Sequence, residues 1–381
     1  MMSCVMLLTP ALQRFDWGST DAIPALLGIE PDGAPFAEAW WGAHPVAPST
    51  TELGPLDEVI AADPVATLGA SCEETHGRLP YLLKVLAIAQ PLSIQVHPTL
   101  ERAREGFEQE QAAGLALNDP HRTYKDSSHK PEMLLALSEV TVLSGFRQAD
   151  AVAQDLRAIG GDDAHGLAAL IEARGIHDYI DVVLTESHPD AVAHLSAAPD
   201  GISASAAVAR DALAIHPDDP GALVALAMNA VTLQPGETLF TPSGVVHCYI
   251  SGLCVEIMAN SDNVVRAGFT HKPVNADLLR DLALLEHTEP LVPHTRVDGA
   301  ARVLSTDADE FELTVVRNGE ATCPGGPRIV VSLDGATRVA TAGQSLTLES
   351  GAAAFIAAAE GPATFDVSGL AVIASVSSRA H

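Results

Sequence analysis

The chain has 381 residues, of which 47% are hydrophobic, and a formal net charge of −28 at pH 7. This length is too great for one small core and predicts two or three structural units. The charge argues against nucleic acid and anionic membranes as partners, because an acidic surface is repelled by both. No apolar run reaches the length needed to span a membrane.

The N-terminus, MMSCVMLLTPALQ, lacks the basic segment and the cleavage site of a secretory signal. The chain has an odd number of cysteines at scattered spacings, which does not indicate a disulfide framework and favours the reducing cytoplasm. These cysteines are Cys4, Cys72, Cys248, Cys254 and Cys323.

The first hundred residues are predicted to form short strands broken by Gly and Pro. LPYLLKVLAIA, residues 79–89, is a continuous apolar run typical of a buried strand. PLSIQVHP, residues 91–98, alternates strictly between apolar and polar residues, which predicts a strand with one buried face. Residues 99–114 begin with a threonine cap, carry early acids and end at glycine, which predicts a helix.

Residues 149–231 are alanine-rich and helically periodic between Gly, Asp and Pro breaks, and they are expected to form a helical insert. Strand patterns return at residue 231. After about residue 290 only short strands and glycine turns follow, which predicts a separate β-sandwich or barrel.

A weak internal repeat links the two β-rich parts. LQPGETLF, with Gly236 and Phe240, has the same spacing as LESGAAAF, with Gly351 and Phe355. The same offset places His247 opposite Pro362. This pattern is equally consistent with two related barrels, of which the second has lost the function of His247, and with a phrase that is common in unrelated strand–turn–strand units.

The segment VVHCYISGLCVEIM predicts a hairpin whose two-residue loop is Ser251-Gly252. In that register His247 lies directly opposite Glu256 and Tyr249 opposite Cys254, on the face away from the core. Polar side chains of this kind are unusual on a solvated face, so a site is expected there.

Four residues from three segments form a donor set suited to zinc. They offer two imidazoles, a carboxylate and an amide oxygen, and they are Gln95, His97, Glu132 and His247. Each one alone is commonly a solvated or structural residue. Arg266 follows in an otherwise apolar stretch, where it suits either a surface ion pair or an oxyanion clamp.

The chain has only four lysines, and all lie near these segments: Lys84, Lys125, Lys130 and Lys272. A compact ammonium at a phosphate or proton-transfer position is not replaceable by a guanidinium, which favours a functional role over chance.

The phrases EAWWGAHPVAPS, PLSIQVHP, HKPEM and PSGVVHCYISGLCVEIMANSDNVVRAG closely resemble type I mannose-6-phosphate isomerases, zinc enzymes of the cupin superfamily. The resemblance is dense over residues 81–146 and 233–290 and thin elsewhere. It implies a mainly β fold of two cupin-like jelly-roll barrels with an α-helical insert domain. Residues 1–148 and 232–290 would form the catalytic cupin-like domain, 149–231 the insert, and 291–381 a C-terminal domain without metal.

The resemblance also implies the activity and the roles of residues. It implies interconversion of mannose 6-phosphate and fructose 6-phosphate, feeding GDP-mannose and carbohydrate metabolism, in a cytoplasmic monomer with one Zn²⁺ per chain. By match, Gln95, His97, Glu132 and His247 are metal ligands and Arg266 is catalytic. Lys130, Glu256, Tyr249 and Lys84 line the pocket, and either Lys130 or Glu256 is the base.

Two other functions remain open at this point. An iron-dependent cupin oxygenase typically groups its ligands in one short H-x-H segment, whereas Glu132 here lies in a separate segment. A non-enzymatic sugar-binding cupin does not need Lys130, Arg266 and Glu256 around a metal. A phosphosugar is thus the expected partner, with no nucleic acid and no membrane.

Overall fold

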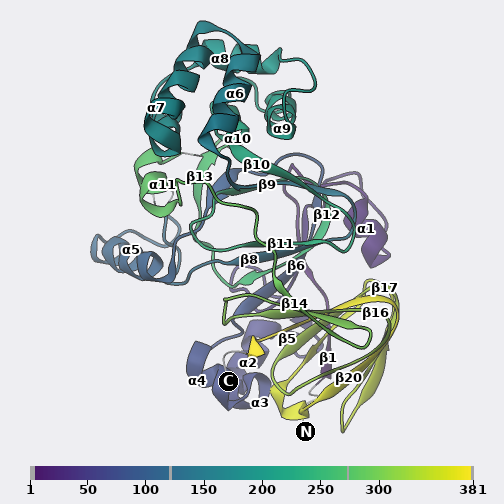
Figure 1. The fold of residues 1–381 in the computed structure, drawn as a ribbon. Coiled ribbons are helices and arrows are strands. Elements are labelled where there is room, and N and C mark those ends of the chain that lie inside the picture. Colours follow the sequence, from purple (N-terminus) through teal and green to yellow (C-terminus); the bar gives the residue numbers. More distant parts are fainter. Residues whose placement is uncertain (1–4, 120–121, 273, 379–381) are drawn as a thin grey trace.

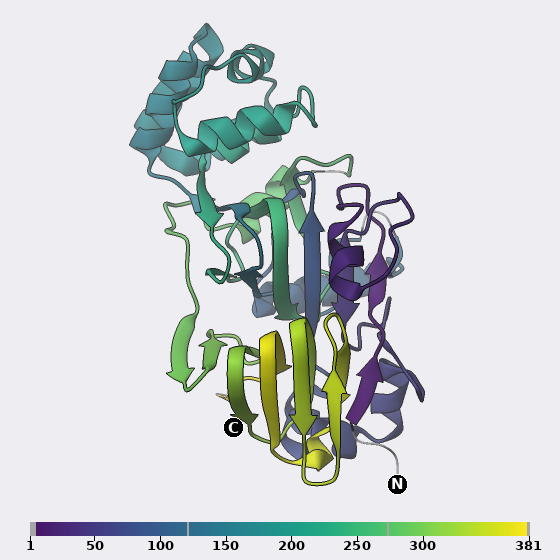
Figure 2. The ribbon, with the colours of Figure 1, turned by 90° about the vertical axis from the view of Figure 1, so that its right-hand side faces the viewer.

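The computed structural model describes residues 5–119, 122–272 and 274–378. Figures 1 and 2 show three tiers: a lobe of helices, a first β-sheet beneath it and a second sheet at the opposite end. The mainly β class with additional helices is therefore confirmed. No helix in the described part of the chain has both the length and the apolarity to cross a membrane.

The first sheet is built around one long strand, β12, which pairs with four others. The predicted apolar strand is present as β6, and every one of its residues is buried. The strands of this sheet are β2 (Ala11–Gln13), β3 (Glu38–Trp41), β6 (Tyr81–Ile88), β7 (Ile94–Val96), β8 (Glu132–Ala136), β9 (Val140–Phe146), β10 (Met228–Leu233), β11 (Thr238–Thr241), β12 (His247–Ala259) and β13 (Val265–Gly268).

The second sheet consists mostly of C-terminal strands but takes one edge strand from the N-terminus. β1 pairs with β19 with Val5 opposite Ile356, although residues 1–148 were assigned to the other β unit. Its short apolar sequence covers the edge and buries three of four side chains. The strands are β1 (Val5–Leu8), β14 (His294–Asp298), β15 (Ala301–Ser305), β16 (Glu312–Cys323), β17 (Arg328–Ala340), β18 (Ser345–Leu348), β19 (Ala353–Ile356) and β20 (Ala363–Ser375).

Short helices and a small ribbon surround the sheets. The predicted helix after PLSIQVHP is confirmed as α5, where the Thr99 side chain accepts a hydrogen bond from the backbone N–H of Arg102. The remaining elements are α1 (Ala22–Leu27), β4 (Thr50–Thr51), β5 (Gly54–Pro55), α2 (Leu56–Ala62), α3 (Pro64–Leu68), α4 (Ala70–His76), α5 (Leu100–Ala112), α11 (Ala276–Leu282) and the 3-10 turn η1 (Ala358–Glu360).

The lobe contains five helices in the described range: α6 (Ala149–Ile159), α7 (Asp162–Thr185), α8 (Pro189–Ser196), α9 (Ala204–Leu213) and α10 (Gly221–Leu226). α7 is kinked at Gly175, whose φ is 82°. The chain returns to the sheet at Met228, three residues before the expected end of the insert. The apolar faces of these helices share one core with Ile94, Val96 and neighbouring strand residues, which fixes the lobe to the first sheet.

The expected hairpin at Ser251-Gly252 is wrong, because β12 runs through these residues as one strand with a bulge between Tyr249 and Ser251. Gly252 has φ 116°, and a Cβ there would lie 2.5 Å from the carbonyl oxygen of Glu139. A turn-like Ser-Gly pair therefore serves as a bend that moves β12 from β9 to β6 and β8.

This correction changes the pairing of the polar residues. His247 lies opposite Gln95 and Ser144, while Glu256 lies opposite Lys84 and Leu134. The expected pairs of His247 with Glu256 and of Tyr249 with Cys254 are absent because there is no reversal of the chain.

Candidate metal centre and cavity

Three potential metal ligands meet where three strands come together. His97 follows β7, Glu132 begins β8 and His247 begins β12, and one donor atom from each lies within 4.8 Å of the others. His97 Nε2 is 3.1 Å from Glu132 Oε1, and His247 Nε2 is 3.2 Å from Glu132 Oε2. All three side chains are buried.

Backbone carbonyls orient both imidazoles. Nδ1 of His97 lies 2.7 Å from the carbonyl oxygen of Asn263, and Nδ1 of His247 lies 3.1 Å from that of Val245. A proton on each Nδ1 satisfies these contacts and leaves Nε2 with a free lone pair. Nε2 of His97 has no hydrogen-bond partner although it is buried next to a carboxylate. A cation between these lone pairs resolves that conflict, so the residues fit a metal.

Gln95 is the half-buried fourth member of the group. Its Nε2 lies 3.4 Å from His247 Nε2, and its backbone pairs with His247 on one side and Arg266 on the other. Rotation of the amide by 180° brings Oε1 to the same place, which offers an oxygen ligand.

The charges at this centre suit a divalent cation. Burial raises the pKa of Glu132, but Lys130 and the two histidines outweigh this effect and hold that pKa well below its usual range. Burial, assisted by Lys130, lowers the pKa of His97 to about 4. A charged carboxylate and a neutral imidazole are the forms in which these groups bind metals.

A second buried group of charges lies on β3, β6 and β12. The Lys84 ammonium is 3.0 Å from Glu256 and 3.4 Å from Glu38. Although burial opposes it, Glu256 and Glu38 raise the pKa of Lys84, which therefore stays protonated. Burial raises the pKa of Glu256 despite the neighbouring lysine. Tyr249 joins this group to the first, because its hydroxyl donates to Glu132 Oε2 at 3.2 Å.

Gln95 and Glu132 of the first group and the members of the second group line one cavity of about 500 Å³, and Glu132 connects this cavity to the two buried histidines. Its wall includes all the predicted pocket residues and Arg266, together with Glu38, His216 and Lys272. Lys130 reaches it from the loop before β8, with its ammonium 3.2 Å from Glu132 Oε1.

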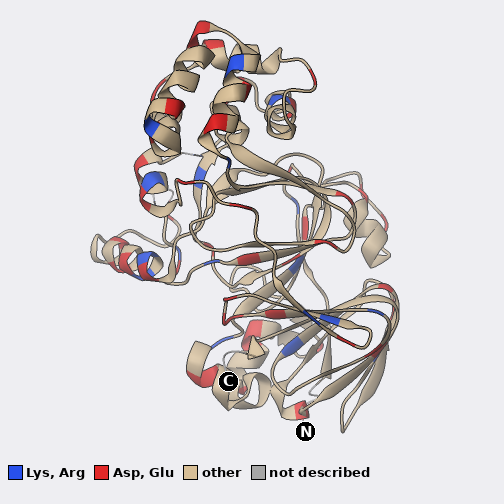
Figure 3. Ribbon diagram, in the orientation of Figure 1, with Lys and Arg blue, Asp and Glu red and all other residues tan. Residues whose placement is uncertain are grey.

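One end of this cavity is cationic in a molecule with 49 acidic and 21 basic residues, whose acids are widely spread (Figure 3). Within the described residues, neither Arg266 nor Lys272 has a carboxylate partner. The charge of Arg266 lowers the pKa of Lys272, and burial and the charge of Lys125 lower it further by smaller amounts. Two cations without carboxylate partners in one cavity, one of which lowers the pKa of the other, indicate an anion-binding end.

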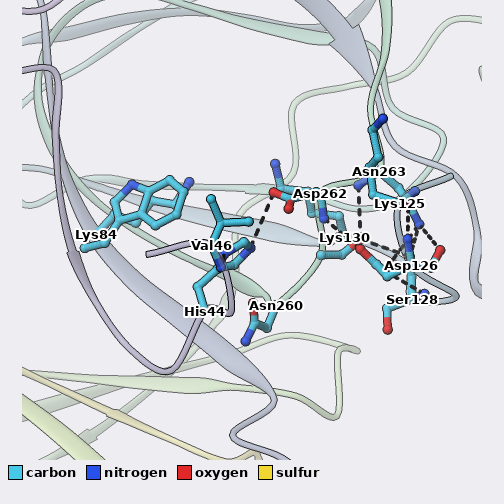
Figure 4. A network of polar contacts seen from close by, with 12 residues as sticks. His44, Val46, Lys84, Lys125, Asp126, Ser128, Lys130, Asn260, Asp262 and Asn263 are labelled. Carbon is cyan, nitrogen blue, oxygen red and sulfur yellow. Dashed lines mark hydrogen bonds and ion pairs between the residues drawn. The ribbon is translucent and has the colours of Figure 1, made fainter. Parts of the chain in front are cut away.

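A polar network around the buried Asn263 fixes the loops that carry Lys130 and Arg266 (Figure 4). The Asn263 side chain accepts from the backbone N–H of Lys125 at 2.7 Å and donates to the carbonyls of Asp126 and Ser128, each at 2.8 Å. The same residue accepts from His97 through its own carbonyl. The Asp126 carboxylate accepts a bond from the backbone N–H of Asp262 at 2.9 Å. The loops before Lys130 and before Arg266 are thereby held to the histidine.

Sequence reasoning did not assign Glu38 or His216 to the site. Glu38 lies in the strand segment EAWW. A carboxylate among apolar strand residues is costly to bury without a partner, and this feature of the sequence could have indicated a site residue. His216 follows α9 in the helical lobe, and nothing in its local sequence distinguishes it from a surface residue. Lys272 stood out only as one of four lysines.

The chain is similar to characterised enzymes over nearly its full length. Residues 5–149 match the family phosphomannose isomerase type I, catalytic domain. The mannose-6-phosphate isomerase of Escherichia coli is 33% identical over 376 residues, covering 94% of this chain and 96% of that protein. The human mannose-6-phosphate isomerase is 30% identical and covers 72% of each chain.

Solved structures agree with this similarity. The mannose 6-phosphate isomerase of Salmonella typhimurium, bound to its substrate and a zinc atom, superimposes with a TM-score of 0.90. The two chains are 30% identical, and the match covers 98% of this chain and 100% of the other. This chain therefore belongs to the family of mannose-6-phosphate isomerases.

Proposed function

We propose that the protein interconverts mannose 6-phosphate and fructose 6-phosphate with zinc as its cofactor. The observation that carries this proposal is the cavity itself, where a buried two-histidine, one-carboxylate cluster adjoins unpaired cations. Membership of the family supports the same activity.

Gln95, His97, Glu132 and His247 are the proposed ligands of the zinc ion. Their donor types suit zinc, and the second nitrogen of each histidine is already held by a carbonyl. When bound, zinc supplies a Lewis acid that polarises the sugar oxygens.

The reaction moves a proton between C2 and C1 of the sugar, and negative charge develops on the intermediate enediolate. Arg266 is proposed to stabilise that charge, since its guanidinium lines the cavity without a carboxylate partner among the described residues. Lys272, which also lines the cavity without a carboxylate partner among the described residues, suits the phosphate end of the sugar. Lys84, Tyr249 and Glu256 are proposed to bind the sugar, because they line the same cavity and offer hydrogen-bond donors and acceptors.

Two side chains are suited to move the proton. Lys130 is near the proposed metal ligands and contacts the carboxylate of Glu132. Burial raises the pKa of the Glu256 carboxylate, which suits a base. Glu256 also lies 3.0 Å from the ammonium of Lys84. Exchange of the C2 hydrogen of the sugar for solvent deuterium distinguishes these two candidates. Lys130→Met is expected to abolish the exchange if Lys130 is the base, and Glu256→Gln is expected to abolish it if Glu256 is the base. Zinc content should be unchanged in the variant that abolishes exchange.

The proposal extends to the architecture and the setting of the enzyme. Two cupin-like jelly-roll domains, residues 1–148 with 232–290 and residues 291–381, are supported by the two antiparallel sheets, and 149–231 is the insert. The four described cysteines are unpaired, which suits the cytoplasm. A monomer is proposed, and light scattering of the purified protein tests it.

The alternative is an iron-dependent cupin oxygenase, and a reconstitution experiment distinguishes the two. Metal-free protein given zinc under anaerobic conditions is expected to convert mannose 6-phosphate. Activity that returns only with ferrous iron, together with oxygen consumption, would overturn the isomerase. Binding of sugar phosphate without conversion in the zinc-loaded protein would support a non-enzymatic cupin.

A further inference from the structure

The helical lobe contributes a turn to the wall of the cavity. Residues 214–220 join α9 to α10, and His216 lines the cavity beside Phe269, His271 and Lys272. The rings of His216 and Phe269 stack with centroids 5.4 Å apart and an angle of 17° between planes. The lobe is thus in direct contact with the segment that follows β13.

Asp219 bonds both sides of this contact. Its Oδ1 accepts from the backbone N–H of Gly221 at 2.7 Å, and its Oδ2 accepts from the backbone N–H of Phe269 at 2.8 Å. One carboxylate therefore joins the start of α10 to the segment between Arg266 and Lys272.

Phe269 has a backbone conformation that its side chain disfavours. Its φ is 51°, in the left-handed region, where a Cβ lies too close to neighbouring backbone atoms for a bulky residue to be favoured. Its side chain is buried, and its N–H is held by Asp219. Strain of this kind persists only where surrounding contacts hold it, and the Asp219 bond is such a contact.

The two backbones also pack without room for a side chain. A Cβ on Gly221 would lie 2.6 Å from the Cα of Gly268, and one on Gly268 would lie 2.5 Å from the Cα of Gly221. Close packing, the carboxylate and the stacked rings act at the same point. The path of the chain from Arg266 to Lys272 is therefore set by the lobe.

We infer that Asp219 is a positioning residue for the phosphate end of the substrate. By holding Phe269 in the left-handed conformation, it sets the position of the Lys272 cation, whereas Arg266 is held separately by the pairing of β13 with β7. The anion that Lys272 binds is the phosphate of the sugar phosphate, and in this respect the inference rests on the proposed function. The helical lobe then determines substrate affinity, whereas the metal centre determines turnover.

Asp219→Asn tests this inference with little change in size. The amide can accept from only one of the two N–H groups, and its own NH₂ faces the other. We expect the KM for mannose 6-phosphate to rise at least roughly tenfold, kcat to stay within about threefold and zinc content to stay unchanged. Calorimetric binding of inorganic phosphate should weaken by the same factor, because phosphate alone reports on the cationic end.

Asp218→Asn is the matched control. Asp218 lies in the same turn, is exposed and has φ 62°, a conformation that asparagine tolerates. The variant loses the same charge but none of the hydrogen bonds described above, so its KM and phosphate affinity should equal those of the wild type. Equal values for Asp219→Asn and Asp218→Asn would overturn the inference, as would a fall in kcat with an unchanged KM.

A second variant tests the same inference if Asp219→Asn fails to fold. In the double variant Asp219→Asn with Phe269→Gly, glycine adopts the left-handed conformation without penalty, so phosphate affinity should recover in part. A double variant that folds but still binds phosphate at least roughly tenfold more weakly than Phe269→Gly alone, with that single variant at the wild-type value, would contradict the role of the backbone. Phosphate binding is measured without turnover. An inactive wild-type protein would therefore contradict the proposed function, but the comparison of phosphate affinities between the variants would still test the role of Asp219.

Discussion

The two sheets use the same local pattern for opposite purposes. The repeat predicted around Gly236 and Gly351 places both glycines at positive φ, 91° and 82°, each in a turn before a short strand. A strand of 13 residues follows in each sheet, β12 in the first and β20 in the second. Similar turns and strand lengths therefore occur in both halves.

The interiors differ in chemistry. β12 buries His247, Tyr249 and Glu256 against other polar and charged side chains. β20 buries Phe365, Val367 and further apolar residues in a core of aliphatic and aromatic side chains. Buried polar groups cost stability unless they are paired. The polar interior of the first sheet is therefore explained by ligand binding, and the apolar interior of the second sheet by packing. Strand pattern alone does not reveal which sheet holds a site.

Removal of a metal ligand should produce the largest contrast. His247→Ala is expected to lose bound zinc and to reduce isomerase turnover to background, because one of the few proposed ligands is gone. The measurement is metal analysis beside a steady-state assay. Stoichiometric zinc with normal turnover would show that the ligand assignment is wrong.

The second sheet offers a matched control for that variant. The hydroxyl of Thr337 donates to Ser332 at 3.0 Å, and both side chains are fully buried. Thr337→Val keeps the shape and should cost about 1 kcal/mol of unfolding free energy. Zinc content and turnover should not change.

A packing change in the second sheet should destabilise the protein without changing the chemistry. Phe365 is completely buried in β20, and Phe365→Ala should lower the free energy of unfolding by about 3–5 kcal/mol. Urea unfolding measures this loss, while kcat of the folded fraction should match the wild type. A fall in kcat under conditions in which the variant is fully folded would show that the second sheet also acts on the site.

Within the first sheet, Arg266→Lys separates catalysis from binding. The variant keeps a positive charge but loses the planar fork, so kcat should fall at least roughly a hundredfold, the scale for one lost oxyanion donor. KM should change far less, and zinc content not at all. Steady-state kinetics and metal analysis test this. A large rise in KM with kcat preserved would assign Arg266 to phosphate binding alone.

A small, pH-dependent effect is expected at the joint between the two regions, where His129 lies 2.7 Å from Glu310. Burial raises the pKa of Glu310, but the hydrogen bond and the charge of His129, with smaller contributions from a backbone hydrogen bond and His76, together outweigh it, so this pKa is lower in the folded protein. The group therefore stabilises the fold above the unfolded glutamate pKa of about 4.3 and loses this contribution as pH falls through the folded pKa.

Glu310→Gln should accordingly lower the free energy of unfolding by about 1–2 kcal/mol near pH 6. The difference from wild type should shrink as pH falls below about 4.3, since protonated glutamate resembles glutamine. Urea titrations at several pH values measure it. A difference that grows towards acid pH would contradict the lowered pKa of Glu310 in the folded protein.

The sequence by itself specified the local elements and most of the candidate site. Strict alternation in PLSIQVHP separated Ile94 and Val96, which are buried, from Gln95, which faces the cavity. A capped, acid-led segment specified α5. The same alternation and the family phrases named His97, Glu132 and His247, which the fold brings within 4.8 Å. These features depend on nearest neighbours in the chain, and so they can be read from short windows.

Only the tertiary structure decided how distant segments pair. Ser251-Gly252 has the composition of a turn, but packing against Glu139 makes it a bend within β12. β1 joins a sheet whose other strands all lie in the C-terminal part of the chain, from His294 onwards. Asp219 reaches Phe269 across 50 residues. Such contacts depend on burial and hydrogen bonding over the whole molecule. No local pattern encodes them, because the same turn or edge-strand residues can pair with several different partners, and only the packing of the complete fold determines which pairing forms.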